Sequence, residues 1–320
     1  MAIDKNFFVN KYFIMGLIVC FTLLFSAAPV FLGTYSIRML TTYFMWIALA
    51  VGWNIFNGYT GHIDFGYVVY FGTGAYVTSL LMIKGGVSFL LSVLCGGMVS
   101  LVLAFIISFP TLHLKGAYFA IATWAFAEAM KQFVLCVPSL TEGSYGISLP
   151  PTLNPSYFYY LMFGCMGVAV ISNYILEKIK LGYNLKALRD AEMAAESLGI
   201  NIFANKVIAF VISAFIAGLV GGIYAYWITY VHPHNVFDGL ITDRIIVMVL
   251  IGGRGTFIGP IIGTILLLTV FEVFWTNLPS GLYLVFMGLI IVVTMMFLPN
   301  GVVGTWKAKG WKIKKNFLRD

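Results

Sequence analysis

Charged residues are scarce in this sequence. They make up 10% of its 320 residues, whereas 61% are hydrophobic and the mean hydropathy is +0.95; soluble domains carry about 25% charged residues. Formal charges are absent from four long stretches, which lie between Lys11 and Arg38, Lys84 and Lys115, Glu142 and Glu177, and Glu272 and Lys307. Each stretch can supply the roughly 20 apolar residues that a membrane-spanning helix needs. The sequence therefore indicates an integral membrane protein.

Sequence motifs of enzymes are also missing. The chain contains no G-x-x-x-x-G-K-[ST] phosphate-binding loop, no H-E-x-x-H zinc signature and no G-x-S-x-G nucleophile elbow. Its four cysteines have no CxxC spacing, and His232 and His234 have no third ligand nearby, so we expect an exterior turn there rather than a metal site. We predict that the chain is not an enzyme and holds no metal or cofactor. Any ATP-driven role requires ATP and Mg²⁺ on a separate ATPase subunit.

Apolar runs between polar or glycine-rich breaks predict an all-α polytopic protein with about ten transmembrane helices. An outer-membrane barrel is disfavoured because the runs are continuously apolar rather than alternating. The eighth helix is the shortest, and a re-entrant hairpin is the alternative there. The expected helices are 12–33, 37–57, 65–83, 87–109, 116–136, 157–177, 206–230, 240–253, 259–277 and 281–298.

The distribution of basic residues predicts the orientation. Lys5 and Lys11 place the N-terminus in the cytoplasm, and six crossings later Lys178 and Arg189 emerge on the same side. Ten crossings put the basic tail there too. The net charge of +7 thus follows membrane orientation and gives no indication of nucleic acid binding. We expect a multi-pass inner-membrane protein, with a transmembrane permease domain over 1–304 and a basic cytoplasmic tail over 305–320.

Two apolar stretches are interrupted by glycine. They are "GYTGHIDFGYVVYFGTGAY" at 58–76 and "GGRGTFIGPIIGT" at 252–264. Paired breaks of this kind are typical of transporters with inverted repeats, and five helices per half would invert the second half. We therefore expect two inverted halves, with a solute pathway near the breaks. The candidate pathway residues are Gly58, Gly61, His62, Asp64, Gly66, Glu128, Gly252, Gly253 and Gly255.

Three acids, Asp64, Glu128 and Glu272, fall in or beside apolar segments, where a charge costs about 2.5–3.5 kcal/mol. Glu128 precedes Lys131 by three residues, which favours a local ion pair over a place in the pathway. Asp64 is expected to cap the third helix by accepting from exposed backbone N–H groups. The alternative is a stand-alone, ion-coupled secondary transporter that uses Glu128 and Asp64 as coupling acids.

Small residues recur at four-residue spacing in the chain. Gly218 and Gly222 form one such pair, and Gly255, Gly259 and Gly263 form a series. Such spacing lets helix backbones approach closely in lipid. We therefore favour tight helix packing over direct solute contact at these positions.

Residues 178–204 are too charged to span the membrane. Within them, "LRDAEMAAESLGIN" (188–201) predicts a short amphipathic helix. Gly199 is the expected C-terminal cap, and the helical spacing places Arg189 to pair with Glu192. The apolar face consists of Leu188, Ala191, Ala195 and Leu198. Alanines and glutamates favour docking into a groove of another protein over the alternative, a helix resting on the membrane surface.

The ordered motifs "GYTGHIDFGYVVYFGTGAY", "LKGAYFAIATWAFAEAMK", "TEGSYGI", "LRDAEMAAESLGIN", "KVIAFVISAFIAGLVGGIYA" and "GGRGTFIGP" resemble the LivM-type permeases. These are membrane subunits of ATP-binding-cassette (ABC) importers for branched-chain amino acids and related compounds. The resemblance covers about residues 35–300. It implies the ABC importer permease fold.

The resemblance further implies that 186–201 is a cytoplasmic coupling loop that docks on the ATPase. The residues matched to it are Arg189, Asp190, Glu192, Ala194, Ala195 and Gly199. The implied partners are a homologous second permease subunit, two ATPase subunits and an extracytoplasmic solute-binding protein. Membrane lipid surrounds the complex.

Four positions depart from the family pattern. The family often has glutamine and serine where this chain has His62 and Asp64, and glycine and aspartate where it has Glu142 and Tyr145. The expected function is import of a small polar solute, foremost branched-chain amino acids. Urea, short amides and other small carboxylates are the alternative solutes.

Overall fold

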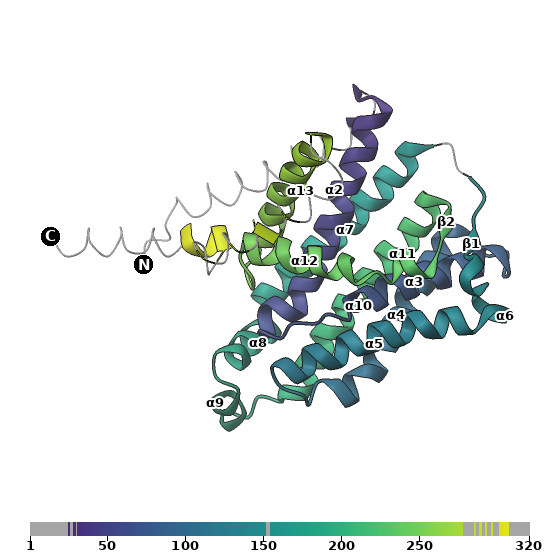
Figure 1. The fold of residues 1–320 in the computed structure, drawn as a ribbon. Helices are drawn as coiled ribbons and strands as arrows, with labels where there is room; N and C mark the ends of the chain where they lie inside the picture. The colour runs from purple at the N-terminus through teal and green to yellow at the C-terminus, as the bar shows by residue number, and fades with distance from the viewer. Residues whose placement is uncertain are drawn as a thin grey trace, which may run out of the picture.

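Helices make up nearly the whole described chain in the computed structural model of the protein (Figure 1). The structure describes residues 25, 28, 29, 31–151, 154–277, 285, 288, 289, 292, 296 and 301–306, with the backbone alone over 272–277. The longer helices are α2 (Thr34–Trp53) continued by η1 (Asn54–Gly58), α3 (Tyr67–Ile83), α4 (Phe89–Thr111), α5 (Ala117–Cys136), α7 (Pro155–Lys178), α10 (Ile202–Ile228), α12 (Gly239–Gly252) and α13 (Gly259–Asn277). The short elements are α6 (Pro138–Thr141), η2 (Gly143–Tyr145), β1 (Ile147–Ser148), α8 (Lys180–Asp190), α9 (Glu192–Ser197), β2 (Tyr230–Val231) and α11 (Pro233–Val236).

Apolar runs determine where the long helices lie. Within the described residues, five segments are long and apolar enough to cross a membrane: Thr34–Gly58, α4, α5, α7 and α10. Helices α3 and α12 are shorter, with 17 and 14 residues. The eight helices expected between 37 and 277 all occur, and their ends agree within four residues. The protein is therefore a mostly helical, multi-pass membrane protein.

Two predicted helices fall almost entirely outside the described residues. They are the first, at 12–33, and the tenth, at 281–298. The eighth is a single continuous helix, α12, so the hairpin alternative does not apply to the segment. Its first turn is capped by Asp238, whose Oδ1 accepts from the backbone N–H of Leu240 at 3.0 Å, as N-cap aspartates do.

Helix α10 lies at the centre of the bundle, in contact with α2, α3, α4 and α7. Small residues permit these close crossings. A Cβ added to Gly74 would fall on the carbonyl oxygen of Gly218, and one added to Gly222 would fall on Thr78 Oγ1. The packing expected of Gly218 and Gly222 is therefore confirmed, because backbone approaches backbone at these crossings.

The short elements gather at opposite ends of the bundle. Figure 1 shows α8 and α9 at one end and β1, β2 and α6 at the other. The two short strands pair antiparallel, with Ile147 opposite Val231. At the same end, Lys84 Nζ lies 2.9 Å from Glu142 Oε1, and Ser144 O lies 3.1 Å from His232 Nε2. The segments that follow α5 and α10 are thus joined at this end of the bundle.

Candidate functional site

The first glycine-rich break follows a change in helix geometry. Helix α2 continues into the π-helical turn η1, a distortion often found at functional sites. The loop that follows is held by Asp64: its backbone N–H donates to Asn57 Oδ1 at 2.7 Å, and its carbonyl oxygen accepts from Trp53 Nε1 at 3.1 Å. Asp64 Oδ1 accepts from the N–H of Gly66 at 2.7 Å. The predicted cap of α3 is wrong: the bond goes to Gly66, the residue before α3, and α3 has no side-chain cap. Asp64 instead fixes the loop that leads into the helix.

The two glycine-rich breaks lie side by side, about 200 positions apart in sequence and joined by Asn54. Asn54 Oδ1 accepts from the N–H of Gly255 at 2.8 Å. Its Nδ2 donates to the carbonyl oxygen of Thr256 at 3.1 Å. Asn54 is fully buried, so both bonds replace water that the amide has lost. The paired breaks that the sequence predicted therefore form one structural unit.

Arg189, from α8, reaches this unit. Its Nη1 donates to the carbonyl oxygen of Gly58 at 3.3 Å. A Cβ at Gly61 would lie 2.8 Å from Arg189 Cγ, and a Cβ at Gly255 would lie 2.5 Å from Arg189 Nη1. Both glycines also have positive φ, of 77° and 69°, which only glycine adopts readily. The predicted coupling segment thus touches both breaks through one arginine.

The predicted coupling segment consists of two helices, so the single helix predicted within 188–201 is wrong. The chain is extended at Ala191, with φ −158° and ψ 90°, and this residue separates α8 from α9. The predicted pair of Arg189 with Glu192 is also wrong, since the break at Ala191 removes the helical spacing. Instead, Arg189 Nε lies 3.4 Å from Asp190 Oδ1, while Glu192 has other partners.

Gly199 closes the C-terminal cap of helix α9, as predicted. The N–H of Gly199 donates to Glu196 O at 2.9 Å, and that of Ile200 donates to Ala195 O at 3.2 Å. This is the Schellman pattern, with Gly199 at φ 79°. Ala195, in contrast, is only 2% exposed and packs into the chain's own core. It therefore packs α9 against the rest of the chain. Ala194 and Gly199, by contrast, are exposed.

Two large apolar side chains of this segment face away from the chain. Met193 and Leu198 are each 81% exposed. The sequence placed Leu198 on one apolar helical face with Leu188, Ala191 and Ala195. The break at Ala191 divides that face, because Leu188 and Ala195 are buried while Leu198 is exposed. Exposed apolar side chains beside each other suit contact with a protein or with a membrane surface. Helix α9 thus presents such a contact surface at one end of the bundle.

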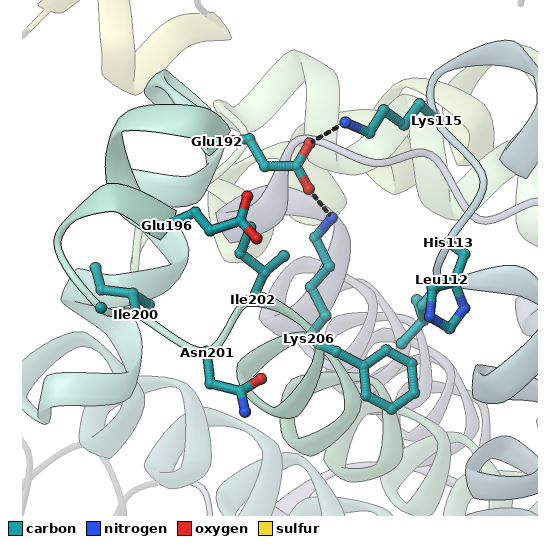
Figure 2. A pocket seen from close by; sticks show the side chains of 11 residues that line it. Leu112, His113, Lys115, Glu192, Glu196, Ile200, Asn201, Ile202 and Lys206 are labelled. Carbon is teal, nitrogen blue, oxygen red and sulfur yellow. Dashed lines mark hydrogen bonds and ion pairs between the residues drawn. The ribbon is translucent and has the colours of Figure 1, made fainter.

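Glu192 lies between two lysines in a groove of about 490 Å³ (Figure 2). Lys206 Nζ, from α10, lies 2.7 Å from Glu192 Oε1, and Lys115 Nζ lies 3.4 Å from Oε2. Lys206 is only 3% exposed, so its charge needs a partner. The hydrogen bond from Lys206 holds the pKa of Glu192 below its usual range, and the charge of Lys115 adds to this. Glu192 thereby ties α9 to α10 and to the segment before α5.

The other candidate residues have different surroundings. Burial lowers the pKa of His62 to about 4, helped by the charge of Lys206, and its ring packs edge-on against Phe119. Glu128 lies 2.6 Å from Lys131 Nζ on the exposed side of α5, which confirms the ion pair. The side chain of Glu272 lies outside the described residues. In the described part of the chain, no three His, Cys, Asp or Glu side chains group to hold a metal ion.

Gly252 and Gly253 end α12 beside the second break. The peptide units of Gly252 and Gly259 lie so close that a Cβ on Gly252 would fall on the Gly259 carbonyl oxygen. Gly253 has φ 119°. These glycines therefore make a tight corner between α12 and α13.

Sequence reasoning missed Asn54 and Lys206. Asn54 falls within the predicted helix 37–57, and Lys206 is the first residue of the predicted helix 206–230. Neither position by itself indicated a role at the site. A lone amide or a lone lysine in an apolar run is the available signal, because either must find a partner when buried. The sequence alone does not name that partner.

Comparison with known proteins identifies the family. Residues 35–295 match the model of the family described as "Branched-chain amino acid transport system / permease component". The chain belongs to this family. It is 28% identical to the high-affinity branched-chain amino acid transport system permease protein LivM of Salmonella typhimurium, over 94% of this chain and 77% of that protein. The LivM protein of Escherichia coli gives the same identity and coverage.

A more distant relative extends the comparison. The guanosine ABC transporter permease protein NupQ of Bacillus subtilis is 32% identical over 29% of this chain and 30% of its own length. No solved structure matches. The family membership and the apolar helices together establish a membrane permease component, which is a transport subunit rather than an enzyme.

Proposed function

We propose that this chain is the transmembrane permease subunit of an ABC importer for branched-chain amino acids, and that α8 and α9 form its coupling segment. The observation that carries the proposal is Arg189, which joins α8 to Gly58 and borders Gly61 and Gly255. An ATPase that moves this segment acts on both glycine-rich breaks at once. In transporters of this kind, interrupted helices form the solute site, and the two halves of the protein move around that site. The permease provides the path, and partner subunits hold the ATP and Mg²⁺.

The proposed assembly contains a second, homologous permease subunit, two ATPase subunits and an extracytoplasmic solute-binding protein. The chain would cross the inner membrane ten times in two inverted halves, with domain 1–304 in the membrane and both termini, including the tail 305–320, in the cytoplasm. One observation supports this orientation. The lysine-rich segments on either side of α8 lie at the same end of the bundle as the segment before α5. The positive-inside rule places such basic loops in the cytoplasm.

The surface of α9 supplies the test of docking. In the double variant Met193→Arg/Leu198→Arg, two exposed apolar contacts become charges. We expect the ATPase subunits to be lost when the permease pair is purified, and ATP-driven leucine uptake to be lost with them. Tyr145→Arg is the matched control, since Tyr145 is 83% exposed and lies between α6 and β1 in the chain, two elements at the opposite end of the bundle. The docking role is wrong if the double variant retains its ATPases and transports normally.

The function itself is tested by reconstitution. The full complex in liposomes, with its binding protein, is expected to accumulate leucine only when ATP is present. Uptake by the purified chain alone, driven by an ion gradient, would instead establish a secondary transporter. ATP-driven uptake of urea or an amide, without uptake of leucine, would keep the importer class and change the solute.

A further inference from the structure

Helix α5 lies at an edge of the bundle (Figure 1). It is one of the five segments that are long and apolar enough to cross a membrane, yet only 22% of the residues in its apolar 18-residue stretch are buried, compared with 72% in α10. Five of its exposed residues follow one another at spacings of three and four, which places them on one side of the helix. They form the α5 face, which consists of Tyr118, Ile121, Ala125, Glu128 and Gln132.

The α5 face carries a charge near the middle of the helix. Glu128 follows Ala117, the first of the 20 residues of α5, by 11 positions. A helix of 20 residues is about 30 Å long and matches the hydrocarbon core of a bilayer. Lys131 Nζ lies 2.6 Å from Glu128 Oε1, and the side chains of Lys131 and Glu128 are 17% and 48% exposed. Charges in the middle of a spanning helix face protein or a wet cavity, because contact with lipid is costly.

Helix α4 shows by contrast what a lipid-facing helix looks like in this protein. It too is long and apolar enough to cross a membrane. Every one of its exposed residues is apolar, among them Leu94, Met98 and Val102, which are 51%, 55% and 52% exposed, and its serines are all buried. Such a surface suits lipid tails. The α5 face, with an acid and an amide, does not.

The chain's own apolar segments do not complement this charge. Within the part of the chain that the structure describes, Lys131 is the one ion-pair partner of Glu128. The predicted first and tenth helices, 12–33 and 281–298, contain no Asp, Glu, Lys or Arg. A charged pair that is covered by apolar groups loses water without gaining a partner. The α5 face therefore calls for a cover that has charged groups of its own.

A second permease subunit meets this requirement. Homologous subunits usually associate about a two-fold axis and present the same surface to each other. An acid and a base on one side of a helix are self-complementary in such a contact, because Glu128 meets the partner's base and Lys131 meets its acid. The spacing of three and four residues also suits two helices that cross at about 20°. Ala125, in the middle of the face, leaves room for a close approach.

We propose that the α5 face is the contact surface for the second permease subunit, which presents a helix with a base opposite Glu128 and an acid opposite Lys131. The inference rests on the proposed function, whose assembly contains that subunit, and it names the surface at which the two permeases meet. The ion pair of α5 then acts between subunits as well as within the helix. Helix α4 stays in contact with lipid.

A photoreactive side chain identifies what covers the α5 face. Benzoylphenylalanine is incorporated in place of Ile121, which is 62% exposed, and the complete complex is irradiated in its membrane. We expect a cross-linked product with the second permease subunit, identified by mass spectrometry. Benzoylphenylalanine in place of Leu94 on α4 is the matched control and should give no product with a permease. A product with a second copy of this chain also supports the surface, and it corrects the composition of the proposed assembly.

An exchange of charges separates contact between subunits from a local role. Glu128→Lys/Lys131→Glu retains an ion pair at the same spacing within α5 but reverses the charges that the partner meets. The amount of second permease that copurifies with the chain should fall roughly tenfold or more, which corresponds to about 1.4 kcal/mol or more. An ion pair that acts only within α5 would leave this amount unchanged, and that result overturns the inference.

A bulky side chain tests the surface with the charges left in place. Ala125→Trp should block the close approach of the second subunit, so that its copurification and ATP-driven leucine uptake fall together. Val102→Trp, on the exposed side of α4, is the matched control and should behave as the wild type does. Equal behaviour of the two variants would show that no subunit packs closely against the α5 face.

The inference and the proposed function fail in different ways. If the complex imports leucine with ATP while the side chain at position 121 reacts only with lipid or with segments of its own chain, the α5 face is not the interface and the importer stands. Uptake by the purified chain alone, driven by an ion gradient, overturns the proposed function wherever the photoreactive side chain reacts.

Discussion

Arg189 Nη1 donates a hydrogen bond to the carbonyl oxygen of Gly58 across 131 positions of sequence. The bond joins α8, at the proposed ATPase face, to the π-helical end of the first spanning segment described. Gly61 and Gly255 approach the same side chain closely. A shift of α8 therefore reaches both glycine-rich breaks by direct contact, with no intervening residue.

Replacing Arg189 should uncouple ATP hydrolysis from transport. In Arg189→Gln, the complex is expected to assemble and hydrolyse ATP, but leucine uptake per ATP should fall roughly tenfold, since residues along a coupling path contribute about 0.5–2 kcal/mol. Uptake and ATPase rates in the same liposomes measure this ratio. Lys180→Gln, an exposed change on the same helix, is the control. An unchanged ratio in Arg189→Gln would show that coupling takes another route.

Replacing Asn54 should loosen the junction between the breaks. Asn54→Ala leaves the partly buried N–H of Gly255 without its acceptor, and an unpaired group removed from water costs about 1–3 kcal/mol. The free energy of unfolding of the purified chain should fall by that amount, measured by denaturant titration in detergent. Thr42→Val is the control: its hydroxyl bonds only within α2, to Arg38 O, and its loss should cost less than about 0.5 kcal/mol.

The pair of Glu192 and Lys206 should give a pH dependence. Because the folded-state pKa of Glu192 lies below its usual range, its contribution to stability is present above the unfolded pKa of about 4.3 and is lost as pH falls through the lower folded value. Melting curves between pH 7 and pH 3 should show this loss in the wild type. Glu192→Gln should be less stable than the wild type at pH 7 and should lack this pH-dependent loss, because Lys206 is buried without a partner charge at every pH.

A double variant separates the pair from the groove. Glu192→Gln/Lys206→Met buries no charge and should recover part of the stability that Glu192→Gln loses. Lys115→Gln, by comparison, breaks an exposed ion pair and should cost less than about 1 kcal/mol. Equal stability of Glu192→Gln and the wild type would mean that water in the groove, rather than Glu192, satisfies Lys206.

The sequence predicts the long helices well because one physical requirement dominates them. A spanning helix must be apolar over its whole length, so the run itself shows where α4 or α10 begins and ends. The coupling segment obeys no such rule. Ala191 is extended, and Glu192 finds Lys206 instead of Arg189; a period of 3.6 residues contains no information about either.

Residues at the edges of apolar runs are the hardest to predict. A charge at such an edge is usually taken as a helix boundary. Asp238 is indeed the N-cap of α12, but Arg244 lies inside the helix, so the same signal marks the boundary in one case and not in the other. Likewise Asn54 and Gly255 meet only because two breaks distant in sequence fold onto each other. Such contacts depend on tertiary packing, which composition and spacing do not contain.

The crossing of α3 and α10 offers a test of packing alone. A Cβ on Gly74 would fall on the backbone of Gly218, so Gly74→Ala forces the helices apart, and overpacking of this kind costs about 1–3 kcal/mol. We expect a lower melting temperature and lower yield of the complex. Gly164→Ala is the matched control, because a Cβ there meets no atom within 4 Å and alanine favours the helix by about 0.8–1 kcal/mol. If the two variants are equally stable, α3 and α10 cross less closely than the structure shows, and the central position of α10 would have to be revised.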